Sequence, residues 1–264
     1  MQYPSETWGL AGEKDPNDGY TINFAYLKVH EMILRSITKD LFVGTGVFYD
    51  YLWNIRELSA PPDGSTAFQR HGLYKDEIAI ALPIRLLFDS RLNQINPSNG
   101  WYVNLTWRDN LKSLGSRQNW QSVVLDMRKY FQVTKSGNVL AFWYYSWRSM
   151  AKTPYLLLPS TGWDDFFNTG RGYIQGRFRS ATMEYLEVEY RFRITPNDML
   201  GGVAFANAQL YQLRLTNGPY NISPAVGGGL RVKLNKYSGA NLCIDYGFGQ
   251  DGSHGLFLNL GEVF

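Results

Sequence analysis

Few residues in this chain have the types and spacing that catalysis or metal binding requires. The three histidines, His30, His71 and His254, lie far apart in the sequence, and neither an H-E-x-x-H nor a G-x-S-x-G pattern occurs. Gly44 and Gly46 lack the remaining glycine of a dinucleotide-binding fingerprint. We therefore expect no catalytic residue, no metal site and no cofactor, and a protein that is not an enzyme. A hydrolase built on a loop is the enzymatic alternative.

A row of charges occupies every other position of one short segment: Glu187, Glu189, Arg191 and Arg193. The residues between and beside them are apolar or aromatic, namely Leu186, Val188, Tyr190, Phe192 and Ile194. Because side chains of a strand alternate between two faces, this pattern predicts a sheet with one ionic and one apolar face. It is typical of a membrane barrel with lipid outside and a polar bore, whereas a soluble β-sandwich would bury the apolar face in its core.

The composition fits a barrel better than its average hydropathy suggests. Mean hydropathy is −0.29, because apolar and polar faces cancel, and 16% of the 264 residues are aromatic. No apolar run reaches the ~18 residues that a membrane-spanning helix needs. The single cysteine, Cys243, excludes a disulfide framework, and a net charge of +3 gives no reason to expect nucleic acid as a partner. We predict a single domain, residues 1–264.

Turn residues divide the chain into twelve predicted strands. These cover 6–13, 20–37, 41–55, 75–89, 100–110, 120–133, 138–150, 181–194, 200–214, 223–235, 240–249 and 255–264. The connections near 38–40, 134–137, 195–199 and 236–239 are short, whereas 56–74 and 151–180 are long. Outer-membrane barrels have an even number of strands joined by short turns at one end and longer loops at the other. The sequence therefore predicts an all-β fold, an antiparallel transmembrane β-barrel of about 12 strands.

The two faces of most predicted strands can be assigned from the alternation of residue types. In 75–89, for example, Ile80 and Leu82 should face lipid and Arg85 should face the bore. In 138–150 the apolar set should face lipid and Arg148 the bore; this set is Val139, Ala141, Trp143, Tyr145 and Trp147.

Seven segments, in order, resemble motifs of the outer-membrane assembly and secretion superfamily, the bacterial surface antigen family that includes the barrel subunit of the BAM complex. They are Phe88-Asp89-Ser90-Arg91 with Pro97 and Gly100, Thr169-Gly170-Arg171-Gly172-Tyr173, Glu189-Tyr190-Arg191-Phe192, Val203-Ala204-Phe205-Ala206-Asn207, Gly227-Gly228-Gly229-Leu230-Arg231, Ile244-Asp245-Tyr246-Gly247 and Gly261-Glu262-Val263-Phe264. The resemblance covers roughly residues 40–264. Three features depart from it: Gly170 stands where the family prefers Val, Asn207 stands where the family has Asp, and only twelve strands can be placed where the family has sixteen.

The resemblance implies a role for the long loop 151–180, which would fold toward the lumen. Its motif is Gly170, Arg171, Gly172 and Tyr173, and Glu187 or Glu189 would hold Arg171 at the wall. Other residues implied at the lumen wall are Arg191, Asn207 and Asp245, and Leu260, Gly261 and Phe264 would belong to a C-terminal β-signal. Two alternatives remain: the loop could lie on the surface with Arg171 in water, or the acidic row could pair only with neighbouring arginines.

The implied location is the bacterial outer membrane, with outer-membrane lipid and lipopolysaccharide around the barrel and a protein substrate or accessory protein as a further partner. Export requires a signal, and none follows Met1, so we expect a signal and any periplasmic domains to have been removed. The implied function is assistance in inserting or translocating protein or lipid, with a loop-plugged lumen. The alternatives are a passive channel for small solutes and a membrane anchor or scaffold for a partner protein.

Overall fold

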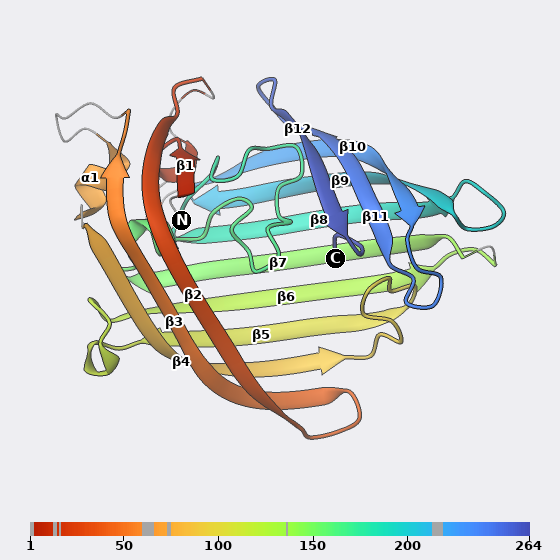
Figure 1. Ribbon diagram of the computed structural model, residues 1–264, viewed down its shortest axis with the longest axis horizontal. Helices are drawn as coiled ribbons and strands as arrows, with labels where there is room; N and C mark the ends of the chain where they lie inside the picture. The colour runs from red at the N-terminus through yellow and green to blue at the C-terminus, as the bar shows by residue number, and fades with distance from the viewer. Residues whose placement is uncertain are drawn as a thin grey trace.

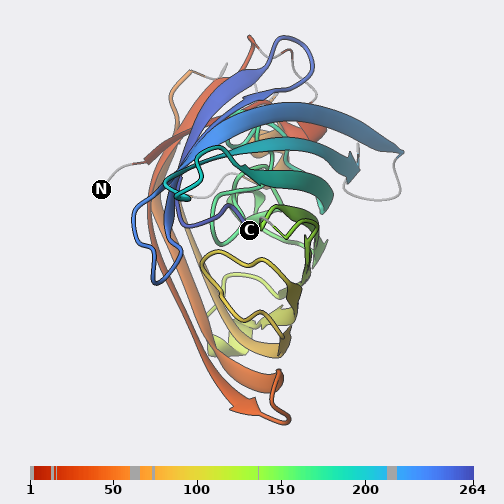
Figure 2. The same cartoon turned by 90° about the vertical axis from the view of Figure 1, so that its right-hand side faces the viewer.

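The computed structural model describes residues 3–12, 15, 17–59, 66–72, 75–135, 137–212 and 219–264. Within them the chain forms one sheet of twelve antiparallel strands, each paired with its neighbours in sequence. The predicted all-β antiparallel barrel is confirmed. Figures 1 and 2 show the sheet curled round the connection between the seventh and eighth strands, drawn in green. No helix in the described residues is both long and apolar enough to cross a membrane.

The strands β2 to β11 agree closely with the predicted ranges, whereas the two end strands differ from them. They are β1 (Tyr3–Thr7), β2 (Tyr20–Ser36), β3 (Leu41–Glu57), β4 (Asp76–Asp89), β5 (Gly100–Asn110), β6 (Trp120–Gln132), β7 (Val139–Ala151), β8 (Thr182–Arg193), β9 (Leu200–Gln212), β10 (Tyr220–Lys233), β11 (Asn241–Phe248) and β12 (His254–Leu260). The short helices are η1 (Leu10–Gly12), α1 (Ala67–Gly72), η2 (Lys112–Leu114) and η3 (Tyr155–Leu157). Part of the long connection predicted at 56–74 lies outside the described residues.

Both end strands are shorter than predicted. β1 ends at Thr7, and Gly9, Ala11 and Gly12 follow with φ angles of 83°, 56° and 64°; three left-handed residues in so short a stretch turn the chain away from the extended conformation. β12 ends at Leu260, and Gly261 follows with a φ of 89°. This left-handed residue turns the chain out of the sheet, so the stretch predicted as strand 255–264 stops four residues early.

Apolar side chains cover the outer face of the sheet. On β12, Leu256, Leu258 and Leu260 are all exposed. The same holds on other strands for Leu82, Ile84, Leu86, Phe142, Leu186, Val226, Leu230 and Phe248. The opposite face is ionic and buried, as Asp126, Arg128, Glu187, Glu189, Arg231 and Asp245 show. The protein thus exposes its apolar face and buries its charges, the reverse of a soluble sandwich.

The face assignment for β7 was wrong. Trp143 and Tyr145 are buried in the bore, whereas Phe142 is exposed, and Arg148 lies outside and pairs with Glu184. The reason is the register: Trp143 is opposite Glu187 on one neighbouring strand, and its indole Nε1 donates to Asp126 across the other at 2.9 Å. A large aromatic residue with a polar atom can therefore lie inside the bore, and at Trp143 that atom has a partner.

Candidate functional site

The motif Gly170–Tyr173 lies deep in the bore, on the connection between β7 and β8. Gly170 and Gly172 have φ angles of 84° and 111°, a backbone conformation that residues other than glycine rarely adopt. A Cβ at Gly172 would lie 2.7 Å from the Cβ of Ala225 on β10, and a Cβ at Gly170 would lie 2.5 Å from Thr161 within the loop. Glycine is needed at both positions because the loop backbone turns sharply and lies directly against its surroundings.

Arg171 is almost fully buried, with 1% of its surface exposed. Its guanidinium group forms ion pairs with Glu187 and Glu189 on β8 and with Asp245 on β11, the last at 2.6 Å. It also lies 3.7 Å from the ring centre of Phe205 on β9. Arginine suits this position because its fork of donors can bind several carboxylates at once, and a buried charge without partners would be costly.

The remaining residues predicted at the wall surround this centre. The side-chain amide of Asn207 donates to the main-chain oxygen of Arg171 at 2.9 Å. Arg191 donates its Nε to Glu189 at 2.6 Å. Sequence reasoning placed all of these residues at the bore, and the structure brings them together around one guanidinium group.

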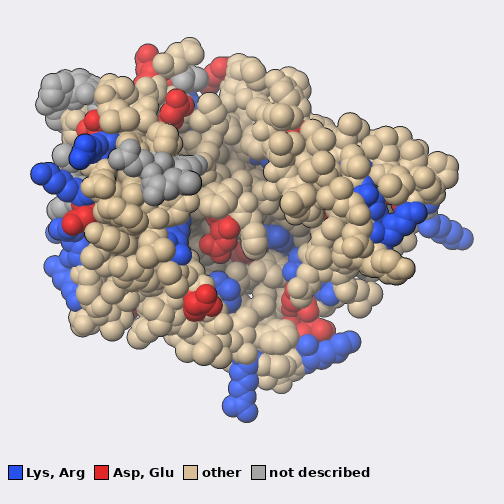
Figure 3. All heavy atoms as spheres, in the orientation of Figure 1, with Lys and Arg blue, Asp and Glu red and all other residues tan. Residues whose placement is uncertain are grey.

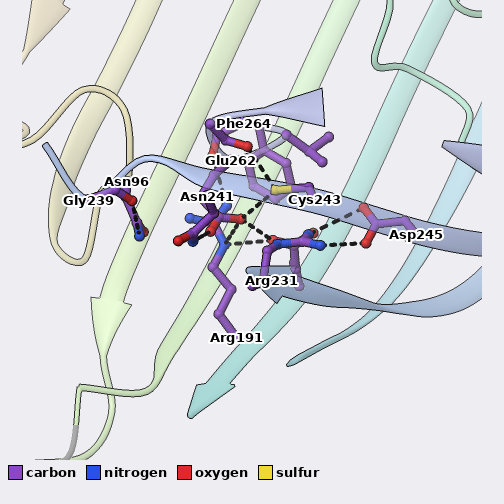
Figure 4. Close-up of polar contacts among 12 residues, drawn as sticks. Asn96, Arg191, Arg231, Gly239, Asn241, Cys243, Asp245, Glu262 and Phe264 are labelled. Atoms are coloured by element: carbon purple, nitrogen blue, oxygen red, sulfur yellow. Dashed lines mark hydrogen bonds and ion pairs between the residues drawn. The ribbon is translucent and has the colours of Figure 1, made fainter. Parts of the chain in front are cut away.

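A further arginine extends the network toward the short-turn end of the barrel (Figure 4). Arg231 on β10 binds Asp245 at 2.5 Å and Glu262 at 2.8 Å. The cluster then contains three arginines, Arg171, Arg191 and Arg231, and four carboxylates, Glu187, Glu189, Asp245 and Glu262. We call these seven residues the ion cluster. The charges nearly balance, which is a condition for burying so many ions.

Tyr173 attaches the other side of the motif to the wall. Its hydroxyl donates to the main-chain oxygen of Pro224 on β10 at 2.6 Å and accepts from the N–H of Gln250 at 3.0 Å. The hydroxyl of Ser253 donates to the main-chain oxygen of Gly172 at 2.9 Å. The motif is therefore held by β8 to β11 and by the connection between β11 and β12.

Residues 261–264 fold into the bore, which the sequence did not predict. Phe264 is 2% exposed and stacks on Trp143, with ring centres 5.2 Å apart. Arg191 donates to its main-chain oxygen at 2.8 Å, and the Asn168 amide donates to that of Val263 at 2.6 Å. Of the residues assigned to the β-signal, Leu260 ends the strand on the outer face, whereas Gly261 and Phe264 leave it.

A signal for this turn is visible in the sequence. Leu256, Leu258 and Leu260 share one face, and the next residue on that face would be Glu262. A carboxylate at a lipid-facing position, directly after a glycine, indicates that the strand has ended. Instead Glu262 lies with Arg231 and Arg191 in the ion cluster.

Sequence reasoning also missed the residues that shape the loop itself. The Asp164 carboxylate accepts from the N–H groups of Asn168 and Thr169, at 3.1 and 2.8 Å, and so closes a turn just before the motif. Thr161 donates to Gln209 on β9 at 2.7 Å. Taken together, these contacts fix the loop. Among the described residues, no group of three His, Cys, Asp or Glu side chains could hold a metal ion.

Comparison with known proteins identifies a similar fold. No family model matches the chain, and no curated protein matches it. Among solved structures, it is similar to the crystal structure of BamA from Haemophilus ducreyi lacking POTRA domains 1-3, with a TM-score of 0.66 and 12% sequence identity. The match covers 97% of this chain and 56% of that one. At this identity the likeness establishes a BamA-like barrel fold and nothing finer.

Proposed function

We propose that the protein is an integral barrel of the bacterial outer membrane, of the surface antigen type, which assists the insertion or translocation of protein or lipid. In this proposal the loop 151–180 closes the bore, and the motif around Arg171 holds the loop in the closed position. The exposed leucines of β4 and β12 would contact acyl chains, since a continuous apolar outer face is stable in lipid and not in water.

The observation that carries the proposal is that the loop contacts both sides of the barrel. Arg171 binds β8 and β11 through Glu187, Glu189 and Asp245. On the other side, the Trp163 ring lies 6.2 Å from that of Phe24 on β2. A segment fixed at both walls crosses the bore, so a passive channel for small solutes is the less supported alternative.

The ends of the sheet support an insertion role over a purely passive scaffold. β1 and β12 are the two ends of the strand order, and β1 pairs with only Tyr20–Phe24 of β2. Strand edges with free backbone groups pair readily with another chain, which is how an incoming strand would be received. Protein or lipid entering the membrane would use this side of the barrel.

The test is complementation in the native host after deletion of the gene. The Arg171→Ala variant should fail to restore outer-membrane protein assembly or lipid transfer, whereas Arg148→Ala, which removes an ion pair on the outer face, should restore it. In planar bilayers the wild type should conduct little and Arg171→Ala should leak. Large, steady conductance of the wild type would favour the passive channel, and co-purification of a stoichiometric partner without an assembly defect would favour the scaffold.

A further inference from the structure

The barrel wall has a lateral opening between its two end strands. β1 covers β2 only as far as Phe24, and within the described residues the edge of β2 beyond it has no strand partner. A cavity of about 380 Å³ lies here, bordered by Tyr26 on β2, Phe257 on β12 and Phe167 and Tyr173 of the loop. Figure 3 shows this face hollowed between β2 and β12, with charged side chains of both signs inside. We call this cavity the lateral opening.

The loop exposes an apolar side chain here, although it is otherwise packed inside a barrel. Phe167, which lines the opening, is 52% exposed. Phe167 has a φ of 57°, a costly conformation for a bulky residue, and the turn that holds it is closed by the Asp164 carboxylate. Together with Tyr26, Tyr173 and Phe257, the exposed Phe167 ring gives the lateral opening an aromatic lining.

Near the lateral opening lies a smaller chamber of about 80 Å³ whose lining cations outnumber its carboxylates. Its lining includes three cations, Lys28, Arg85 and Arg108, and two carboxylates, Asp50 and Asp165. Arg108 is paired with Asp50. Within the described residues neither Lys28 nor Arg85 forms an ion pair, and the Arg85 Nε donates only to the hydroxyl of Thr106 at 3.0 Å. We call this space the cationic chamber.

One side chain connects the two cavities. The Trp163 ring, which lines the cationic chamber, lies 6.5 Å from Tyr26 and 6.2 Å from Phe167, both at the lateral opening. The Lys28 ammonium lies 5.4 Å from the same ring. The aromatic cavity at the lateral opening therefore lies beside a chamber in which Lys28 and Arg85 form no ion pair among the described residues. This arrangement is complementary to a molecule with an apolar chain and an anionic head.

We propose that the lateral opening and the cationic chamber form a binding site for one anionic membrane lipid. An acyl chain lies against Tyr26, Phe167 and Phe257, and the phosphate group accepts hydrogen bonds from Lys28 and Arg85. The volume of the opening is in the range of ordinary ligand pockets. The inference rests on the membrane location proposed above; it does not depend on the role of the Arg171 loop in insertion.

Native mass spectrometry of the whole chain in detergent tests the site. The probes are phosphatidylglycerol, which is anionic, phosphatidylethanolamine, which is zwitterionic, and glycerol 3-phosphate, which has the head chemistry without acyl chains. We expect one phosphatidylglycerol to be retained in preference to phosphatidylethanolamine, and glycerol 3-phosphate to compete poorly. Lys28→Gln and Arg85→Gln should each weaken phosphatidylglycerol binding by on the order of tenfold, the effect of losing a charge-assisted hydrogen bond. Lys28→Arg should restore binding.

Lys129→Gln is the matched control, since Lys129 lies over the Trp101 and Phe131 rings and lines neither cavity. Phe167→Ser should weaken binding of both lipids, and folding of every variant is checked by its mobility on unheated gels. Equal loss in Lys129→Gln, no preference for the anionic lipid, or full competition by glycerol 3-phosphate would each overturn the lipid site. These outcomes leave the proposed function standing, whereas failure of the wild type to enter liposomes would remove the function first.

Discussion

Replacing Arg171 with alanine tests whether the ion cluster holds the loop in the bore. The Arg171 side chain is 1% exposed, and the side chains of its three carboxylate partners are 0% exposed. Its removal leaves Arg191 and Arg231 to balance all four carboxylates of the ion cluster, so the net charge changes from −1 to −2. Removing one partner of a buried ion pair costs about 3–5 kcal/mol, and we expect a loss of this size in the free energy of unfolding.

The assay is urea unfolding in detergent, followed by the difference in gel mobility between heated and unheated samples. The matched control is Arg148→Ala, whose ion pair with Glu184 lies on the outer face with more than half of the Arg148 side chain, 57%, exposed. That variant should lose less than about 1 kcal/mol. Because the cost for Arg171 is attributed to unbalanced carboxylates, the same change made in a Glu187→Gln background should cost less.

Two results would contradict this reasoning. If Arg171→Ala and Arg148→Ala unfolded at the same urea concentration, the buried ion pairs would contribute no more than the exposed one. If Arg171→Ala lost stability but its conductance stayed at the wild-type level, the ion cluster would stabilise the wall without keeping the bore closed.

Three further substitutions address the tail and the loop. Phe264→Ala removes a buried ring from its stack on Trp143 and should cost about 3–5 kcal/mol in the same urea assay; an unchanged midpoint would show that the tail is dispensable. Gly172→Ala places a Cβ 2.7 Å from β10 and should raise conductance, whereas Gly252→Ala, at a φ of 73° with no atom within 4 Å, controls for backbone strain alone and should not. Asn207→Asp removes the amide that donates to the main-chain oxygen of Arg171, and should lower the free energy of unfolding by about 1–3 kcal/mol. Equal stability of Asn207→Leu and wild type would show that this hydrogen bond does not stabilise the loop.

The sequence by itself determined the strands and most of their faces. Alternation with a period of two is a local property, and glycine, proline and asparagine mark turns wherever they cluster. The row from Glu187 to Arg193 therefore predicted β8 and its inward ionic face, and Asp245 was assigned inward from its own strand. The motif around Arg171 was found by resemblance, since nothing local indicates where a loop will fold.

Tertiary structure decided which buried charges meet. Glu189 and Asp245 lie on strands separated by two others, and it is the curvature of the sheet about the loop that brings both to Arg171. The orientation of Trp143 likewise depends on a neighbouring strand. An aromatic residue is stable on either face of a membrane barrel, and Trp143 faces the bore because its indole N–H finds Asp126 there. The glycine at position 261 permits the turn. The direction of the chain after it is set by contacts in the bore, where Arg231 binds Glu262 and Trp143 stacks on Phe264.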